Sequence, residues 1–429
     1  MKSYTLPYGG STVSFEADNV IFEARTAEFD PGLEPCELID RAIDRPIGTA
    51  PLSNLVSPDS RVVIIVDDIT RPTPRRLILK SLSRCLEKIP GLDISIVLAL
   101  GTHRPMTSQE IEEDLGEFAE KYPVVNISYL DVGRFAPAGV MPDGTKIMVY
   151  REILEADFII GVGNIVPHIA AGWGGGAKII MPGVCGEETT NAIHNISNTK
   201  QNMVETSGST DNLFRRTMEE LAGRVGLSFI VNTVLDDNGK LLGVFAGDFI
   251  KAHRAGVAFA EKVLCPEIPE RADILVVSAN PANADFWQGA KPYVFAHRAV
   301  KKGGVMILLL SAEFGICGCA PAHEKTIRKY YNKSAAELEK AIAEKEDEDI
   351  LGIGEAFIRV QTEGFCTTIL LSEGISCEDA QLLGFEKADS MAAALKRAYA
   401  IAGENAKVGI IPYGGEMLCR IKPAACSDN

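Results

Sequence analysis

The chain has 429 residues, 46% of them hydrophobic, and a formal net charge of -15 at pH 7. This length predicts two or three domains, and the negative charge argues against a nucleic acid partner because a phosphate backbone would be repelled. The ten cysteines include no CxxC pair and the first residues lack the apolar core of a signal peptide, so we expect reduced thiols and a cytoplasmic protein.

The first predicted elements are a hairpin and a set of strands buried on both faces. Residues 4–15 alternate between apolar and polar types around a Gly-Gly pair, which is typical of a hairpin. Continuous apolar runs, each closed by a polar cluster, follow at residues 62–66, 94–100 and 158–162. Runs without alternation indicate parallel strands. Two helices are predicted between these strands, at residues 72–89 and, behind a capping box, at residues 111–120.

Residues 158–177 form a run of twenty residues without a formal charge, long enough to cross a membrane. The run contains Asn164, Pro167, His168 and six glycines, which oppose insertion as a helix. We therefore predict a strand followed by a functional loop, and no membrane partner.

The rest of the chain predicts a second α/β unit. Two short strands flank an Asp-Asp-Asn-Gly turn at residues 236–239, a helix follows at residues 249–264, and Cys265 with Pro266 marks a break. Four further strands are predicted at residues 274–277, 305–310, 368–371 and 408–411, and a solvated helix at residues 335–349.

The predicted fold class is therefore α/β, with two α/β domains, mainly parallel sheets and an active-site cleft between the domains. We expect residues 1–266 to form a cofactor-binding domain and residues 267–429 a second domain. Within the second, residues 405–429 are expected to pack back on the first. Ligands of such folds gather at the carboxyl ends of the strands.

The segment HIAAGWGGGAKIIMPGVCGEETTNAIH, residues 168–194, holds the densest group of candidate functional residues. Gly174, Gly175 and Gly176 can adopt positive φ and let a phosphate approach the backbone amides. Lys178 follows them, and its amine could bond to a cofactor or pair with an anion. The alternative is a glycine-rich loop that only lets two elements pack closely.

Two familiar nucleotide-binding motifs do not match. A Walker loop requires Ser or Thr after its lysine, whereas Ile179 follows Lys178. The dinucleotide fingerprint requires a third small residue after Gly161 and Gly163, and Val166 stands there. ATP hydrolysis and dinucleotide binding are therefore not expected.

Four motifs in order resemble the nickel-dependent lactate racemase family. They are DDITRPTP at 67–74, GTHRPMT at 101–107, the segment at 168–194 and FWQGAKP at 286–292. The family carries a DDxTRP motif, a GTHR-like motif, a His, Lys and His spaced by ten and sixteen residues, and a QxxK pair; His168, Lys178 and His194 have this spacing. The family loop commonly reads GFSGGGK, whereas this chain has GWGGGAK.

The resemblance implies a role for each matched residue. Lys178 would hold a nickel pincer nucleotide, a pyridinium mononucleotide with two sulfur-containing arms, through a thioamide link, and His194 would be the protein ligand of the nickel. The remaining matches are acid/base residues, further cofactor contacts and substrate contacts: His103 and His168; Asp68, Gly174, Gly175 and Gly176; Arg71, Gln288 and Lys291. The implied partners are a 2-hydroxy acid substrate and the proteins that mature the cofactor.

The chemistry of a 2-hydroxy acid fits these residue types. Its α-hydrogen is hard to remove as a proton, so inversion is easier if hydride leaves to an electrophilic acceptor while a base takes the hydroxyl proton. Returning the hydride to the other face of the 2-oxo acid inverts the centre. Two imidazoles with pKa values near neutrality suit the proton transfers.

Two other functions use the same residues. One is a hydrolase or lyase with an ordinary divalent metal held by the three motif histidines, and the other is a non-enzymatic cofactor-binding protein. The sequence leaves open whether the substrate is lactate or a related hydroxy acid. The sequence leaves open whether Arg104, next to His103, pairs with Glu110 or contacts a ligand. Outside the motifs we expect surface or helix-cap positions for His253, His297 and His323.

Overall fold

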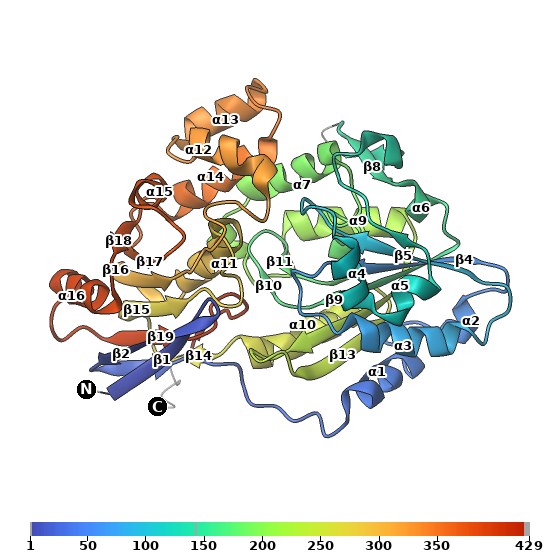
Figure 1. Cartoon of the computed structure of the whole chain (residues 1–429), viewed down its shortest axis with the longest axis horizontal. Helices are drawn as coiled ribbons and strands as arrows, with labels where there is room; N and C mark the ends of the chain where they lie inside the picture. Colours follow the sequence, from blue (N-terminus) through green and yellow to red (C-terminus); the bar gives the residue numbers. More distant parts are fainter. Residues whose placement is uncertain (1, 142–143, 424–429) are drawn as a thin grey trace, which may run out of the picture.

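The computed structural model describes residues 2–141 and 144–423. The chain forms two lobes side by side, each built on a six-stranded sheet (Figure 1). The strand order is β13-β12-β9-β4-β5-β6 in the first sheet and β18-β17-β16-β15-β19-β3 in the second. The mixed α/β class with mainly parallel sheets is thereby confirmed.

The first sheet is parallel except for β13, which pairs antiparallel with β12. Every residue of β9 is buried, so the uncharged run at 158–177 begins with a central strand, as predicted. Among the described residues, no helix is both long and apolar enough to cross a membrane. The strands are β4 (Arg61–Asp67), β5 (Asp93–Ala99), β6 (Val124–Val125), β9 (Phe158–Asn164), β12 (Leu227–Leu235) and β13 (Leu241–Gly247).

The three helices predicted in the first lobe are present, with different ends for the first two, and the lobe has further helices that were not predicted. Thr107 caps its helix through the amide of Glu110, but Gly116 adopts φ 57 and divides the predicted helix in two. Pro74 precedes the first turn of α3, which therefore begins at Arg75. The helices are α1 (Pro35–Asp44), α2 (Leu52–Leu55), α3 (Arg75–Leu86), α4 (Ser108–Leu115), α5 (Glu117–Lys121), α6 (Arg151–Leu154), α7 (Glu187–Lys200), α8 (Met203–Thr206), α9 (Leu213–Arg224) and α10 (Lys251–Leu264).

The second sheet is parallel throughout. The predicted solvated helix is shorter than expected because α13 ends at Ala343. The strands are β15 (Ala272–Ser278), β16 (Val300–Leu309), β17 (Thr367–Leu371), β18 (Glu386–Ala388) and β19 (Val408–Ile411), with β3 (Val20–Glu23) at the edge. The helices are α11 (Phe286–Ala296), α12 (Glu324–Tyr330), α13 (Ala335–Ala343), α14 (Ile350–Thr362), α15 (Cys377–Leu383) and α16 (Met391–Ala402).

The amino-terminal residues pack with the second sheet, although the sequence grouped them with residues 1–266. The hairpin of β1 (Lys2–Tyr8) and β2 (Ser11–Ala17) buries Tyr4, Leu6 and Phe15 against the second sheet, and β3 pairs with β19. The alternation that revealed the hairpin shows that one face is apolar, but not which sheet that face covers.

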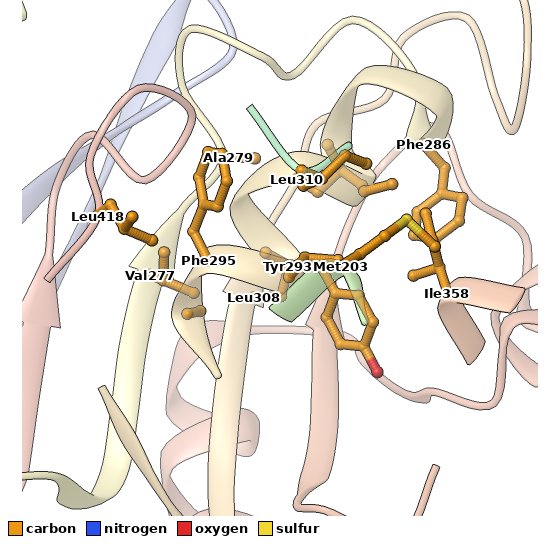
Figure 2. Close-up of a cluster of buried hydrophobic side chains, with 14 of the residues drawn as sticks. Met203, Val277, Ala279, Phe286, Tyr293, Phe295, Leu308, Leu310, Ile358 and Leu418 are labelled. Carbon is orange, nitrogen blue, oxygen red and sulfur yellow. The ribbon is translucent and has the colours of Figure 1, made fainter. Parts of the chain in front are cut away.

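The two lobes share an apolar core and direct hydrogen bonds. Figure 2 shows Met203 of α8 extending toward Phe286 and Ile358, close to Tyr293. The side-chain amide of Gln361 on α14 accepts a hydrogen bond from the Met203 amide at 2.7 Å and donates to carbonyls at the end of α7. These contacts hold the lobes in one arrangement.

The last described residues return to the junction between the lobes. After β19 the chain turns through Gly414 and Gly415, and the Leu418 amide donates to the carbonyl of Leu264 at the end of α10. The short strand β20 (Arg420–Ile421) then pairs with β14 (Glu267–Ile268). Residues 424–429 of the predicted returning segment lie outside the described residues.

Candidate active site

A cavity of about 510 Å³ lies where the carboxyl ends of β4, β5 and β9 face α11 and the turn after β19. Its volume is in the range of small-molecule sites. The lining includes all but one of the predicted site residues, namely Asp68, Arg71, His103, His168, Gly174, Gly175, Lys178, His194, Gln288 and Lys291. Gly176 is the exception, and its amide donates to Asn232 Oδ1 at 2.7 Å.

Asp68 fixes the orientation of His103. Its Oδ2 lies 2.5 Å from His103 Nδ1, and its Oδ1 accepts from the amide and hydroxyl of Thr70 at 2.9 and 2.5 Å. Burial would raise the pKa of Asp68, but the neighbouring His103 and Arg71 lower it well below its usual range. The carboxylate is therefore charged and holds the proton of His103 on Nδ1. Nε2 is left as an acceptor, 3.4 Å from the amide nitrogen of Gln288.

The neighbouring Asp67 has a structural role in the same turn. It accepts from Thr73 Oγ1 at 2.6 Å and from Arg75 Nη1 at 2.8 Å. The Arg75 guanidinium also forms a bidentate pair with Asp114 of α4, with both distances 2.6 Å. This buried network holds the turn that presents Asp68 and Arg71.

His168 presents its other ring nitrogen. The backbone amides of Ala170 and Ala171 both donate to His168 Nδ1, at 3.1 and 3.2 Å. Burial and the charge of Lys178 lower the pKa of His168 well below its ordinary value, so the ring is neutral. Since Nδ1 accepts, the proton of the neutral ring is on Nε2.

His194 has the opposite tautomer. Its Nδ1 donates to the carbonyl of Thr190, one turn earlier on α7, at 2.7 Å. Burial lowers its pKa to about 4, so the imidazole is neutral at pH 7. The lone pair is then on Nε2, which is the form that binds a metal ion.

The glycine loop is held by buried side chains of three elements. Arg215 of α9 is fully buried and donates to the carbonyls of Ala171, Trp173 and Gly175. His253 Nε2, on α10, lies 2.9 Å from the carbonyl of Gly174. Asn232 Oδ1, on β12, accepts a hydrogen bond from the amide of Gly176. Gly175 has φ 71, and a Cβ there would lie 2.8 Å from Asn232 Oδ1, so this position requires glycine.

The expectation of a surface or helix-cap position is confirmed for His297, the C-cap of α11, and for His323, the N-cap of α12, but it is wrong for His253, which lies inside α10. All three are buried, because each occupies a helix face or turn packed against an apolar core. His323 stacks on Trp287 with ring centroids 4.7 Å apart and donates from Nδ1 toward Asp349 at 2.8 Å. Of the two alternatives left open for Arg104, the structure shows the ion pair with Glu110, at 2.6 Å.

Three basic side chains, those of Arg71, Lys178 and Lys291, line the cavity. Burial and the charge of Arg71 lower the pKa of Lys178 to about 7, so a large fraction of its amine is unprotonated at neutral pH. Burial and the charge of Arg71 also lower the pKa of Lys291 well below its ordinary value. Lys291 donates to Gln288 Oε1 at 2.7 Å, and Gln288 thereby links it to His103.

Several lining residues, among them Trp287, Asn164, Asn232 and Glu416, were not assigned a role from the sequence. Trp287 lies within the FWQGAKP motif and Asn164 ends β9. Tryptophan and asparagine occur in many structural settings, so neither residue by itself indicates a binding site. Asn232 lies inside β12, where no local signal marks it. Glu416 follows β19 and a Gly-Gly pair, so the strand-end rule that found the other residues could have found it.

The fold and the site together define a ligand-binding α/β enzyme whose cavity combines three imidazoles, two lysines and a glycine loop. The model of the lactate racemase N-terminal domain matches residues 8–206, and that of the lactate racemase C-terminal domain matches residues 268–418. The chain belongs to the lactate racemase family, and it is an isomerase of the racemase type.

Two relatives cover nearly the whole chain. The lactate racemase of Thermoanaerobacterium thermosaccharolyticum is 28% identical over 98% of this chain and 100% of its own length. That of Lactiplantibacillus plantarum is 28% identical over 96% and 99%, respectively. The solved structure of the T. thermosaccharolyticum lactate racemase apoprotein has a TM-score of 0.88 at 27% identity, covering 98% of this chain and 100% of that one.

Proposed function

We propose that the chain interconverts the enantiomers of lactate or a related 2-hydroxy acid, with a nickel pincer nucleotide held by Lys178 and His194. The observation that carries this proposal is the convergence of His103, His168, His194 and Lys178 on one cavity. Separate pockets for these four groups would have excluded it.

The residues present fit the cofactor. The amine of Lys178 is partly unprotonated at neutral pH, as formation of a thioamide link through its nitrogen requires. His194 directs an unprotonated nitrogen away from its own helix backbone, as a metal ligand requires. Gly174 and Gly175 line the cavity without side chains that would block a phosphate, and Asp68 belongs to the same lining. When bound, the nickel pincer nucleotide supplies an electrophilic acceptor for the α-hydrogen as hydride.

His103 and His168 are the proposed acid/base pair. His103 Nε2 would accept the hydroxyl proton of the substrate, and Asp68 would stabilise the imidazolium that forms. His168 starts as the donor, because its Nδ1 faces two amides and its Nε2 carries the proton. Before substrate binds, His103 Nε2 is therefore the proton acceptor and His168 Nε2 the proton donor of the pair.

Arg71, Gln288 and Lys291 are the proposed substrate contacts. Charge-assisted bonds from Arg71 and Lys291 would hold the substrate carboxylate while the 2-oxo form presents its other face. Gln288 bridges Lys291 and His103, so the carboxylate and hydroxyl contacts are mechanically linked. Residues of both lobes contribute walls to the cavity.

The two alternatives account for less of the site. Within residues 2–141 and 144–423, no three His, Cys, Asp or Glu side chains are grouped so that they could hold a metal ion by themselves. A single protein ligand suits a metal already held by the arms of a nucleotide better than a hydrolytic metal centre. A protein that only stores the cofactor would not need the Asp68 and His103 pair.

The test uses cofactor-loaded protein and single enantiomers of several 2-hydroxy acids. We expect each active acid to approach equal amounts of both enantiomers, measured by chiral chromatography, and the Lys178→Ala chain to retain neither nucleotide nor activity. Loaded protein that racemises none of the acids would contradict the proposal.

We also propose a cytoplasmic site of action, handling by cofactor maturation proteins, and a domain boundary near residue 266.

A further inference from the structure

Among the three successive loop glycines, only the amide of Gly175 has no hydrogen-bond partner within the described part of the chain. The amide of Gly174 donates to the carbonyl of Val166 at 2.7 Å, and that of Gly176 donates to Asn232 Oδ1 at 2.7 Å. Gly175 lines the cavity and keeps more exposed surface than its two neighbours, which are buried. Nearly all backbone amides away from bulk water have a partner, so a free amide on a cavity wall is a candidate contact for an anion.

The direction of this amide is set by the other edge of the same peptide group. The peptide between Gly174 and Gly175 is trans, so the Gly174 carbonyl and the Gly175 N–H point in opposite directions. His253 Nε2 lies 2.9 Å from that carbonyl, and His253 is not part of the cavity lining. The carbonyl held toward α10 therefore turns the Gly175 N–H away from α10.

Arg254 and Glu219 fix the form of His253 that donates. A guanidinium has no acceptor, so Arg254 Nη1 must donate to His253 Nδ1, which lies 2.9 Å away. Burial lowers the pKa of His253 well below its ordinary value, so the ring is neutral and its single N–H is on Nε2. Glu219, on α9, holds Arg254 by two hydrogen bonds, at 2.8 and 2.9 Å.

No other described side chain holds this peptide in its orientation. Arg215 donates to the carbonyls of Trp173 and Gly175, on either side, but not to that of Gly174. Glycine adopts positive and negative φ with similar ease, so a peptide between two glycines rotates at low cost unless a hydrogen bond fixes it. The bond from His253 is therefore what selects one direction for the Gly175 amide.

We propose that His253 is a positioning residue that presents the Gly175 amide to the phosphate of the nucleotide cofactor, an inference that rests on the proposed function. A phosphate monoester is a strong acceptor, and a backbone N–H flanked by glycines lets it approach closely. His253 does not contact the ligand and acts only through the peptide that it holds.

The experiment measures binding of nicotinamide mononucleotide and nicotinamide riboside to the cofactor-free full-length chain by calorimetry. The two probes differ only in the phosphate, so the ratio of their dissociation constants isolates the phosphate contact. We expect wild type to bind the mononucleotide more tightly. His253→Leu should reduce this preference about tenfold, the factor that loss of one hydrogen bond to a charged group produces.

Two further variants separate positioning from stability. His253→Gln places an amide N–H near the position of Nε2 and should keep most of the preference. His297→Leu is the matched control, because it removes another buried histidine, whose hydrogen bond is to the carbonyl of Tyr293 and not to the loop. This variant should keep the wild-type preference.

An unchanged preference in a folded His253→Leu chain, including equal weakening of both probes, would overturn the inference and leave the racemase proposal standing. Wild type that binds the mononucleotide no more tightly than the riboside would instead overturn the nucleotide site of the proposed function.

If His253→Leu does not fold, NMR of wild type decides. Glycine labelled with carbon-13 at the carbonyl and nitrogen-15 at the amide selects the amides of glycines that follow another glycine, Gly175 among them. We expect the Gly175 amide proton to move downfield with the mononucleotide but not with the riboside. Equal shifts with the two probes would overturn the inference.

Discussion

Replacing Asp68 by Asn should reverse the tautomer of His103. The amide and hydroxyl of Thr70 both donate to Asp68 Oδ1, at 2.9 and 2.5 Å, so the oxygen of an introduced Asn would stay there. The Asn NH₂ group would then face His103 Nδ1, which must become the acceptor. His103 would present N–H to the cavity and could no longer accept the substrate proton.

The expected loss in kcat follows from the same geometry. In enzymes where a carboxylate orients a catalytic histidine, the Asp to Asn change lowers kcat by about 10⁴-fold through the wrong tautomer. Asp68 contacts its histidine at 2.5 Å and is almost fully buried, so solvent cannot reorient the ring at low cost. We expect a fall of about 10³-fold or more, which corresponds to about 4 kcal/mol in the activation barrier.

The assay is the initial rate of enantiomer conversion at equal cofactor content, with nickel measured in each preparation. Thr70→Val is the matched control, because it keeps the carboxylate and the Thr70 backbone amide and should lose far less activity. An Asp68→Asn chain that folds, binds cofactor and keeps more than about a tenth of the wild-type kcat would refute the tautomer argument. Asp68 also contributes to stability above its unfolded pKa near 4, and this contribution should be lost only as the pH falls further, toward the lowered folded pKa.

Three further predictions test other parts of the site. Because burial lowers the pKa of Lys178 to about 7, its acylation by a small amine-reactive reagent in the cofactor-free chain should increase as the pH rises through 7. Peptide mass spectrometry measures the extent of acylation, and an increase only near pH 10 would contradict the prediction. Nitrogen-15 NMR of histidine-labelled protein should show His168 protonated on Nε2 and His194 on Nδ1, with Gln variants giving the assignments; the reverse tautomers would remove the basis for their roles. Arg215→Met should lower the free energy of unfolding by about 3 kcal/mol or more, because three buried carbonyls lose their donor; a denaturant midpoint equal to wild type would show that the loop does not depend on Arg215.

The central strands could be predicted because a strand buried on both faces consists of a continuous run of apolar residues. β4, β5 and β9 are apolar runs with polar residues at their ends, and that rule also placed Asp68 and His103 in one cavity. The spacing of His168, Lys178 and His194 added the family resemblance. These features depend on residues close together in the sequence, so they can be predicted from a single sequence.

The features that were missed depend on contacts distant in sequence. His253 is buried because the carbonyl of Gly174, 79 residues earlier, needs a donor. Gly176, which does not line the cavity, donates its amide to Asn232, 56 residues later. Glu416 acquires its setting only when the turn after β19 meets α11. No periodicity in the sequence encodes such pairings.

The pairing of β3 with β19 makes the first lobe an insertion within the second. β3 is synthesised within the first 23 residues, and its partner strand begins at Val408. During synthesis β3 therefore has no partner strand until β19 has been made, when almost the entire polypeptide has left the ribosome. A fragment beginning at residue 267 would lack both this outer strand and the hairpin that covers the sheet, so the carboxy-terminal half should be expressed together with residues 2–23 if it is to be obtained as an independent folding unit.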